Sequence, residues 1–439
     1  MLPALLPSPR LQLNRRRGAP VPSPSPPDLA RASLRHLSAA AVTARIPLDR
    51  LGDGGLLEWL RQAPEAPLHV TLIIPDDTRP LPPGQLLPPL LSRLTTLNRP
   101  LNVHVLVGLG LHAPSGLDFT RDLAEALEPF RDTLAATWSF HDAAATERAG
   151  LPLNRHVMSR SRGGATDRVV TVGLVEPHQY AGFSGGYKGL SIGCGATSTI
   201  GRIHSLKLLR DEGVAIGNID GNPFRDVLNA TARADSAPTW AIALVPSPDG
   251  EGFVGLFEGE PLQTFREAAL HARERLMVPV REPFDFALIG VPEVKALNFY
   301  QASRALTYLA LHPSPCVRPG GALVIEATCP DGYGQGAGER SFQRTLARGA
   351  GALLRELSGA SDPPEAPGGG AQRAYVLAKA LDRFDCVLIG GPDLPEARQA
   401  GLRQLDHAEQ LDLSGVGLVV ADPFVATPYL DARERTHAP

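Results

Sequence analysis

Eight short runs rich in valine, isoleucine and leucine constrain the fold of this chain more than any other feature of its sequence. Continuous apolar runs, as opposed to alternating ones, are typical of parallel strands that are buried on both faces. Helix-like stretches separate the runs, so the sequence predicts an α/β fold with mostly parallel sheets flanked by helices. The runs lie at 69–75, 102–111, 169–177, 240–246, 284–291, 321–327, 386–391 and 416–422.

The length of the chain, 439 residues, indicates about two domains, because a single hydrophobic core stops growing at about 250–300 residues. Residues 1–27, which include PVPSPSPP, are expected to form a flexible proline-rich tail. The stretch MVPVREPFD at 277–285 carries two prolines and marks the predicted junction. We therefore expect a larger domain over 28–280 and a smaller C-terminal α/β domain over 281–439.

The composition favours a small-molecule ligand. The chain has 43 basic and 46 acidic residues and a net charge of -3, so it has no global field that would attract nucleic acid or an anionic membrane. The four cysteines include no C-x-x-C pair, and no stretch approaches the roughly 18 consecutive apolar residues of a membrane helix. The sequence predicts a soluble, cytoplasmic protein with reduced thiols.

Lysine is rare in this chain, and one of its few lysines lies in a conspicuous place. Only four of the 43 basic residues are lysines, and Lys188 lies in the glycine-rich segment HQYAGFSGGYKG. A partly desolvated amine can act as a nucleophile, whereas a guanidinium stays protonated. His178 precedes Lys188 by ten residues and His204 follows it by sixteen. This pattern predicts a covalently tethered cofactor beside a metal-binding or proton-transfer histidine.

Polar residues follow three of the apolar runs. Asp76 to Arg79 come directly after the first run, His112 follows the second, and His178 follows the third. The carboxyl ends of parallel strands form the ligand-binding edge of an open α/β sheet, so these side chains are expected to share one site. Simpler interpretations remain for each: DDTRP can be a turn in which Asp77 or Thr78 caps a helix, and the glycines can serve only a tight turn.

Taken together, these segments resemble the nickel-dependent lactate racemase family. The resemblance covers most of residues 45–310. Its specific element is the string P-H-Q-Y-A-G-F-S-G-G-Y-K at 177–188, and D-D-T-R-P at 76–80, G-L-H at 110–112 and His204 support it in order and spacing.

The resemblance implies a nickel pincer nucleotide as cofactor, a pyridinium-3-thioamide-5-thiocarboxylate mononucleotide that carries nickel and is made by pincer-synthesis enzymes. Lys188 would be its covalent tether, and His204, expected at the start of a helix, would be the protein's nickel ligand. His112 and His178 would be the two general bases, one for each hand of a 2-hydroxy acid substrate. The remaining contacts to the nucleotide are implied for Asp76, Asp77, Thr78 and Arg79, of which Arg79 would also contact the substrate.

A second segment, NFYQASRAL at 298–306, resembles the substrate-binding part of the family. The resemblance places Gln301 and Arg304 on the substrate carboxylate. The family usually has lysine where this chain has Arg304, and arginine binds carboxylates with a different reach and geometry. The larger domain would then be the cofactor-binding catalytic domain, with the active site in the cleft between the two domains.

The leading interpretation is a racemase or epimerase of a 2-hydroxy acid that works by reversible hydride transfer to the cofactor. Two alternatives remain open. One is a non-catalytic homologue of the same fold that binds a hydroxy acid or a nucleotide. The other is a pyridoxal-phosphate enzyme in which Lys188 forms the Schiff base and GFSGG holds the phosphate.

Overall fold

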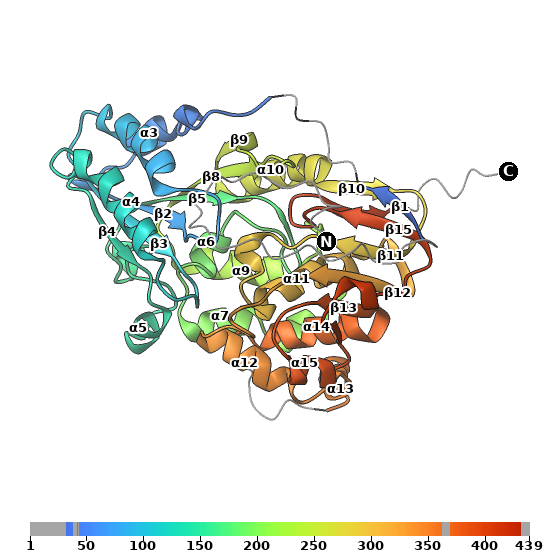
Figure 1. Ribbon diagram of the computed structural model, residues 1–439. Coiled ribbons are helices and arrows are strands. Elements are labelled where there is room, and N and C mark those ends of the chain that lie inside the picture. The colour runs from blue at the N-terminus through green and yellow to red at the C-terminus, as the bar shows by residue number, and fades with distance from the viewer. Residues whose placement is uncertain (1–31, 38–41, 43, 362–368, 432–439) are drawn as a thin grey trace. The chain divides into compact units, whose positions relative to one another are not determined.

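The computed structural model describes residues 32–37, 42, 44–361 and 369–431. The predicted proline-rich tail at 1–27 lies outside these residues. The chain divides into two compact units, which we call the N-terminal unit (residues 42–247 and 251–274) and the C-terminal unit (the remainder, mainly residues 275–439). Figure 1 shows their helices and strands.

The N-terminal unit is built on a six-stranded sheet in the order β4-β3-β2-β5-β8-β9. All neighbouring strands are parallel except β9, which runs antiparallel to β8 at one edge. The central strand β2 is buried along most of its length, as its continuous apolar run predicts. The strands are β2 (Leu68–Pro75), β3 (Leu101–Gly108), β4 (Thr137–Phe140), β5 (Arg168–Leu174), β8 (Thr239–Pro246) and β9 (Phe253–Gly259).

Helices pack against this sheet. Helix α3 contributes a stripe of buried leucines to the core, and each such side chain stabilises the fold by about 1.5–3 kcal/mol on burial. The helices that the N-terminal unit contains or begins are α2 (Leu56–Arg61), α3 (Pro83–Thr95), α4 (Leu117–Leu127), α5 (Ala143–Arg148), α6 (Lys188–Ser191), α7 (Thr197–Ile203), α8 (Leu206–Leu209), α9 (Pro223–Asp235) and α10 (Pro261–Leu276). Short 3-10 helices lie at Leu48–Arg50, Glu128–Phe130 and Arg160–Arg162, and a small antiparallel pair joins β6 (Pro177–His178) to β7 (Gly182–Phe183).

The C-terminal unit has its own six-stranded parallel sheet in the order β1-β15-β11-β12-β13-β14. Its strands are β1 (Ala32–His36), β11 (Phe284–Ile289), β12 (Val317–Glu326), β13 (Asp385–Ile389), β14 (Arg403–Leu405) and β15 (Gly415–Val420), and β10 (Met277–Val280) pairs with β16 (Thr427–Leu430) outside the sheet. Its helices are α11 (Phe299–Ala310), α12 (Ala337–Leu346), α13 (Ala350–Ser358), α14 (Ala371–Arg383) and α15 (Pro395–Gln399), with 3-10 turns at Glu293–Lys295 and Ala408–Gln410.

The predicted fold class is confirmed. Each of the eight apolar runs forms a strand, and the two sheets are mostly parallel with helices between their strands. One segment differs in its placement: the sequence assigned residues 32–36 to the first domain, whereas β1 pairs in parallel with β15 at the edge of the C-terminal sheet. All four cysteines are buried and carry free thiols. In the part of the chain that the structure describes, no helix is long and apolar enough to cross a membrane.

Candidate functional site

The segment that follows β2 forms a tight polar turn. Asp76 Oδ1 accepts hydrogen bonds from the backbone N–H of Thr78, at 3.3 Å, and from its hydroxyl, at 2.5 Å. The N–H of Arg79 donates to the Asp76 carbonyl at 3.2 Å. Helix α3 begins only at Pro83, and no side chain caps it. The turn interpretation of DDTRP is therefore confirmed, and the helix-cap interpretation is wrong.

The second carboxylate oxygen of Asp76 holds His112. Oδ2 lies 2.7 Å from His112 Nδ1, and Asp76 is only 5% exposed while the His112 side chain is 47% exposed. Burial alone would raise the pKa of Asp76, but hydrogen bonds from His112 and Thr78 and the charge of Arg79 outweigh it and lower this pKa. An ionised carboxylate accepts only, so Nδ1 carries the proton and Nε2 keeps its lone pair. The sequence had assigned Asp76 to the cofactor and did not foresee this contact.

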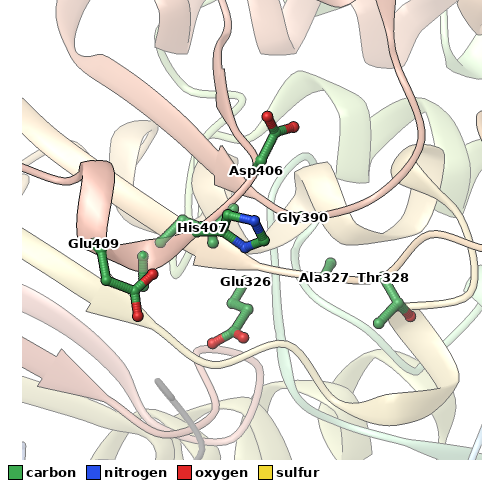
Figure 2. A pocket seen from close by; sticks show the side chains of 9 residues that line it. Glu326, Ala327, Thr328, Gly390, Asp406, His407 and Glu409 are labelled. Carbon is green, nitrogen blue, oxygen red and sulfur yellow. The ribbon is translucent and has the colours of Figure 1, made fainter. Parts of the chain in front are cut away.

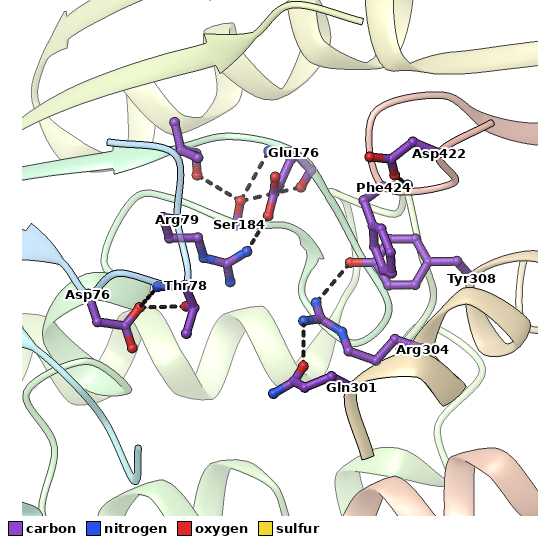
Figure 3. A network of polar contacts seen from close by, with 11 residues as sticks. Asp76, Thr78, Arg79, Glu176, Ser184, Gln301, Arg304, Tyr308, Asp422 and Phe424 are labelled. Atoms are coloured by element: carbon purple, nitrogen blue, oxygen red, sulfur yellow. Dashed lines mark hydrogen bonds and ion pairs between the residues drawn. The ribbon is translucent and has the colours of Figure 1, made fainter. Parts of the chain in front are cut away.

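A buried ion pair fixes Arg79. Its Nη1 lies 2.5 Å from Glu176 Oε1, and the two side chains are 20% and 12% exposed (Figure 3). The N–H of Glu176 donates to Ser184 Oγ at 3.0 Å, and that hydroxyl donates to the Leu174 carbonyl at 2.7 Å. Sequence reasoning missed Glu176, although it directly precedes the Pro-His of the glycine-rich string.

Asp77 supports the segment that carries His112. Its Oδ2 accepts the Gly116 N–H at 3.0 Å, and its own N–H donates to Ser115 Oγ at 3.4 Å. Asp77 thus ties the loop after β3 to the loop after β2.

The glycine-rich loop begins with the hairpin of β6 and β7, which places His178 in a buried position. Its Nδ1 accepts the backbone N–H groups of Tyr180, at 3.3 Å, and Ala181, at 3.2 Å. Gly182 has φ of +74° and lies so close to Asn218 that a Cβ atom would come within 1.9 Å of its carbonyl oxygen. Only glycine fits this position.

Lys188 is the first residue of α6 and is partly buried. Gly185 and Gly186, both with positive φ, turn the chain into this helix. The N–H of Lys188 donates to the Gly185 carbonyl at 3.4 Å.

A buried, positively charged residue in the first turn of α9 holds the glycine-rich loop in place by hydrogen bonds. Arg225, 3% exposed, donates to the carbonyls of Ala181 at 3.1 Å, Gly185 at 3.0 Å and Phe183. Burial lowers the pKa of Arg225 to about 9. Its guanidinium also stacks 3.8 Å from the ring centroid of Phe265, and it forms no ion pair with any carboxylate in the described part of the chain.

Asn222, which caps α9, completes this support. Its side-chain oxygen accepts the Arg225 N–H at 3.2 Å, and its Nδ2 donates to the Tyr180 carbonyl at 2.9 Å. Neither Asn222 nor Arg225 was singled out in the sequence, because nothing in the local pattern links α9 to a loop about 40 residues earlier.

His204 lies at the end of a helix. It caps the C-terminus of α7, and α8 starts only after Ser205, so the expectation that it would begin a helix is wrong. Its Nδ1 donates to the Ile200 carbonyl at 2.9 Å. Tyr180 packs between the two histidines, with ring centroids 5.6 Å from His178 and 5.9 Å from His204.

The donor set of the loop bears on metal binding. Nδ1 of His204 donates its proton to a backbone carbonyl, so Nε2 of the same ring carries the lone pair that could bind a metal. This is the usual arrangement of a histidine that ligates a metal. Across the residues that the structure describes, no group of three or more His, Cys, Asp or Glu side chains could hold a metal ion.

The predicted carboxylate-binding residues lie on α11 in the C-terminal unit. The Asn298 side chain caps this helix by accepting the Gln301 N–H at 3.0 Å. Arg304 donates to Gln301 Oε1 at 3.4 Å and to the Tyr308 hydroxyl at 3.3 Å, and its guanidinium lies 5.3 Å from the ring centroid of Phe424 (Figure 3). These contacts keep both side chains half-buried and ordered on one helix face.

The C-terminal unit also has a pocket at the carboxyl ends of β12 and β13 (Figure 2). None of the residues predicted from the sequence lines it. Its polar lining consists of Glu326, Thr328, Asp406, His407 and Glu409.

Known proteins resemble this chain over its N-terminal unit most clearly. Residues 58–217 match a family described as the lactate racemase N-terminal domain. A lactate racemase from Thermoanaerobacterium thermosaccharolyticum is 27% identical over 285 residues, 63% of each chain. One from Lactiplantibacillus plantarum is 25% identical over 275 residues, 61% of each chain. The chain thus spans slightly more than three fifths of the curated relatives that it matches.

Solved structures extend the likeness of fold to most of the chain. The lactate racemase apoprotein from Thermoanaerobacterium thermosaccharolyticum superposes with a TM-score of 0.64 at 17% identity, covering 88% of this chain and 96% of that one. A protein from Thermotoga maritima superposes equally well at 16% identity, covering 88% and 97%. At these identities the superpositions speak for the fold alone.

Proposed function

We propose that this chain, whose residues 58–217 match the lactate racemase N-terminal domain, is a member of the lactate racemase family and an isomerase that racemises or epimerises a 2-hydroxy acid. The observation that carries the proposal is the pair formed by Asp76 and His112. A buried carboxylate that fixes Nδ1–H of a half-exposed histidine leaves Nε2 as a proton acceptor facing the outside of the fold. This arrangement suits general base catalysis.

Inversion of a 2-hydroxy acid by hydride transfer needs a group that removes the hydroxyl proton. In our proposal His112 and His178 handle this proton for the two mirror-related substrate poses. A well-placed base contributes about 10²–10⁴-fold to such a step. Arg79, fixed by Glu176, and its neighbours Asp77 and Thr78 would bind the nucleotide, and Arg79 would also contact the substrate.

The residues present fit a nickel pincer nucleotide, which when bound supplies the acceptor for the hydride at C2. Lys188 offers an amine at the end of a glycine-rich loop, and His204 offers Nε2 as a single imidazole ligand. We propose that Lys188 is the covalent tether and that His204 is the only ligand that the protein contributes to the nickel. Maturation would then depend on pincer-synthesis enzymes in the cytoplasm.

Gln301 and Arg304 are the proposed partners of the substrate carboxylate. Arginine presents two parallel N–H groups to a carboxylate, a geometry that lysine lacks. The arginine at this position favours a 2-hydroxy acid whose carboxylate is bound through both oxygens.

The decisive experiment makes the protein together with the pincer-synthesis enzymes and measures its intact mass and nickel content. We expect one nickel per chain and an adduct that peptide mapping places on Lys188. Lys188→Arg should lose the adduct, while Lys207→Arg, at another of the four lysines, should keep it. An unmodified wild-type chain under these conditions would count against the proposal.

The same preparation identifies the substrate. A panel of enantiopure 2-hydroxy acids, sugar acids included, is incubated with the loaded protein and the chirality is followed. Inversion of one or more compounds supports the isomerase. Binding of a hydroxy acid without inversion would instead favour the non-catalytic homologue.

A further inference from the structure

The two histidines make opposite hydrogen bonds through the same ring atom. Nδ1 of His112 faces the carboxylate of Asp76, which can only accept. Nδ1 of His178 faces the N–H groups of Tyr180 and Ala181, which can only donate. The first contact requires a proton on Nδ1, and the second requires a lone pair there.

These contacts fix opposite tautomers. His112 carries its proton on Nδ1 and has a lone pair on Nε2. The neutral ring of His178 must carry its proton on Nε2. Rotating the His178 ring by half a turn would put a ring carbon against two buried N–H groups and leave both without an acceptor, which disfavours that orientation.

The amides that face His178 are themselves held in place. The carbonyl of Tyr180 and the N–H of Ala181 belong to one peptide unit, and Asn222 Nδ2 donates to that carbonyl at 2.9 Å. Asn222 is 1% exposed. Fixing the oxygen end of a planar peptide aims its N–H end, so Asn222 points the Ala181 N–H at His178.

We propose that His112 and His178 are not equivalent: His112 rests as a base, whereas His178 rests as a hydrogen-bond donor through Nε2, and Asn222 is the positioning residue that keeps it so. The assignment of the two tautomers rests only on the hydrogen bonds that the two Nδ1 atoms make. Their catalytic consequence rests on the proposed function.

The consequence follows from counting protons. When a hydroxy acid presents its hydroxyl to His112, the O–H bond breaks and the proton goes to Nε2, while the hydride from C2 would be taken up by the bound cofactor of the proposed function. In the mirror-related pose Nε2 of His178 already holds a proton. That proton must leave to water and another must enter at Nδ1 before Nε2 can accept the substrate proton, and the two loop amides must turn away first.

This extra step makes the two directions unequal in a defined way. The equilibrium constant between enantiomers is one, so kcat/KM is equal for both. The enantiomer that starts at His178 should therefore show both a lower kcat and a lower KM, by about tenfold for two modest hydrogen bonds.

The tautomers can be measured directly in the protein without cofactor. The chain is labelled with ¹⁵N-histidine, and two-bond ¹H–¹⁵N correlations are recorded, with His112→Gln and His178→Gln used for assignment. We expect an unprotonated Nδ1 with a protonated Nε2 in His178 and the reverse in His112. A protonated Nδ1 in His178 would overturn the proposal.

Asn222→Ser tests the positioning role, because serine still caps a helix but is too short to reach Tyr180. His178 should become a mixture of tautomers in this variant, while His112 stays unchanged. The control is Asn218→Ser, which removes an amide that donates to Gly213 instead. If His178 keeps a single tautomer in Asn222→Ser, Asn222 is not the positioning residue.

In the loaded enzyme Asn222→Ser should bring the two kcat values closer together. Equal kcat values for both enantiomers in the wild type would overturn the catalytic half of the proposal even if the tautomers are as expected. A chain with the expected tautomers but without an adduct at Lys188 would instead contradict the proposed function.

Discussion

Asp76 shows how one buried residue sets the chemistry of its neighbour. Its two carboxylate oxygens have different partners: Oδ1 accepts a hydrogen bond from Thr78 and closes the turn, and Oδ2 orients His112. The lowered pKa of Asp76 keeps it ionised down to acid pH. Its stabilising contribution is therefore present above the ordinary pKa of 3.8 and is lost only as the pH falls through the lowered folded value.

Asp76→Asn should lower kcat strongly while leaving cofactor loading intact. The amide keeps the size of the side chain but removes the charge that stabilises protonated His112, so we expect a loss of about 10²–10⁴-fold. Turnover is measured alongside the mass of the Lys188 adduct. Asp118→Asn, an exposed carboxylate on α4, should leave both unchanged. Full activity in Asp76→Asn would mean that His112 needs no charged partner.

The sequence predicted which polar residues follow the strands of the N-terminal sheet. It did not predict the residues to which they are hydrogen-bonded. Asp76, His112 and His178 follow β2, β3 and β5, which are neighbours in the sheet, as the apolar runs indicated. Which residues form hydrogen bonds with these side chains depends on the path of the loops. Spacing along the sequence does not reveal that path. Glu176, Asn222 and Arg225 were therefore missed.

At the scale of elements, the first turn of α9 is the support of the glycine-rich loop. Arg225 donates to three carbonyls of that loop, and its positive charge is balanced there by the carbonyl dipoles and the Phe265 ring. A guanidinium suits this task because its planar fork reaches several carbonyls at once. The Gly185 carbonyl accepts hydrogen bonds from both Arg225 and the N–H of Lys188, which connects Lys188 to α9.

Arg225→Met should destabilise the N-terminal unit by about 3 kcal/mol or more, because it leaves several buried carbonyls without a donor. Urea denaturation measures the change. Arg225→Lys should recover part of the loss, since an ammonium can still reach one or two carbonyls. Arg233→Met removes an exposed arginine from the same helix and serves as control. A loss of stability in Arg225→Met no larger than that in the control would contradict the proposed support of the loop by Arg225.

Strands and helices differed in how well the sequence predicted them. The eight interior strands can be recognised in the sequence as continuous apolar runs, because both of their faces are apolar. The edge strands β1, β4, β9 and β14 do not, since one side of each is exposed and polar residues are tolerated there. The prediction for His204 was wrong by a short distance: a helix, α8, does begin nearby, but its first residue is Leu206 and its N-cap position is Ser205.

At the scale of the whole molecule, we expect the half-buried His104 and the buried His312 to make the fold sensitive to acid. In the N-terminal unit, burial and then the charge of His156 lower the pKa of His104 to about 4, and the two rings stack at 3.9 Å between centroids. In the C-terminal unit burial lowers the pKa of His312 to about 4, although a bond to Ser314 opposes this. The unfolded chain binds a proton at each site near pH 6.5, and the folded chain does not.

Stability should accordingly be full above about pH 6.5 and fall as the pH drops from there toward 4. For His104 alone the loss at pH 5 is about 2 kcal/mol. His104→Gln should flatten the fall between pH 7 and pH 5 in urea denaturation of the N-terminal unit. The exposed His36→Gln is the control. An unchanged slope in His104→Gln would show that His104 does not cause the acid sensitivity.

The pairing of β1 with β15 also bears on how the protein is made. Ala32–His36 are synthesised well before their partners at 415–419, because about 380 residues separate the two strands. The N-terminal sheet, whose strands all lie between residues 68 and 259, can assemble during translation. The edge of the second sheet cannot close until β15 has been synthesised, so Ala32–His36 must remain without this partner, accessible to chaperones and proteases, while the residues between the two strands are added.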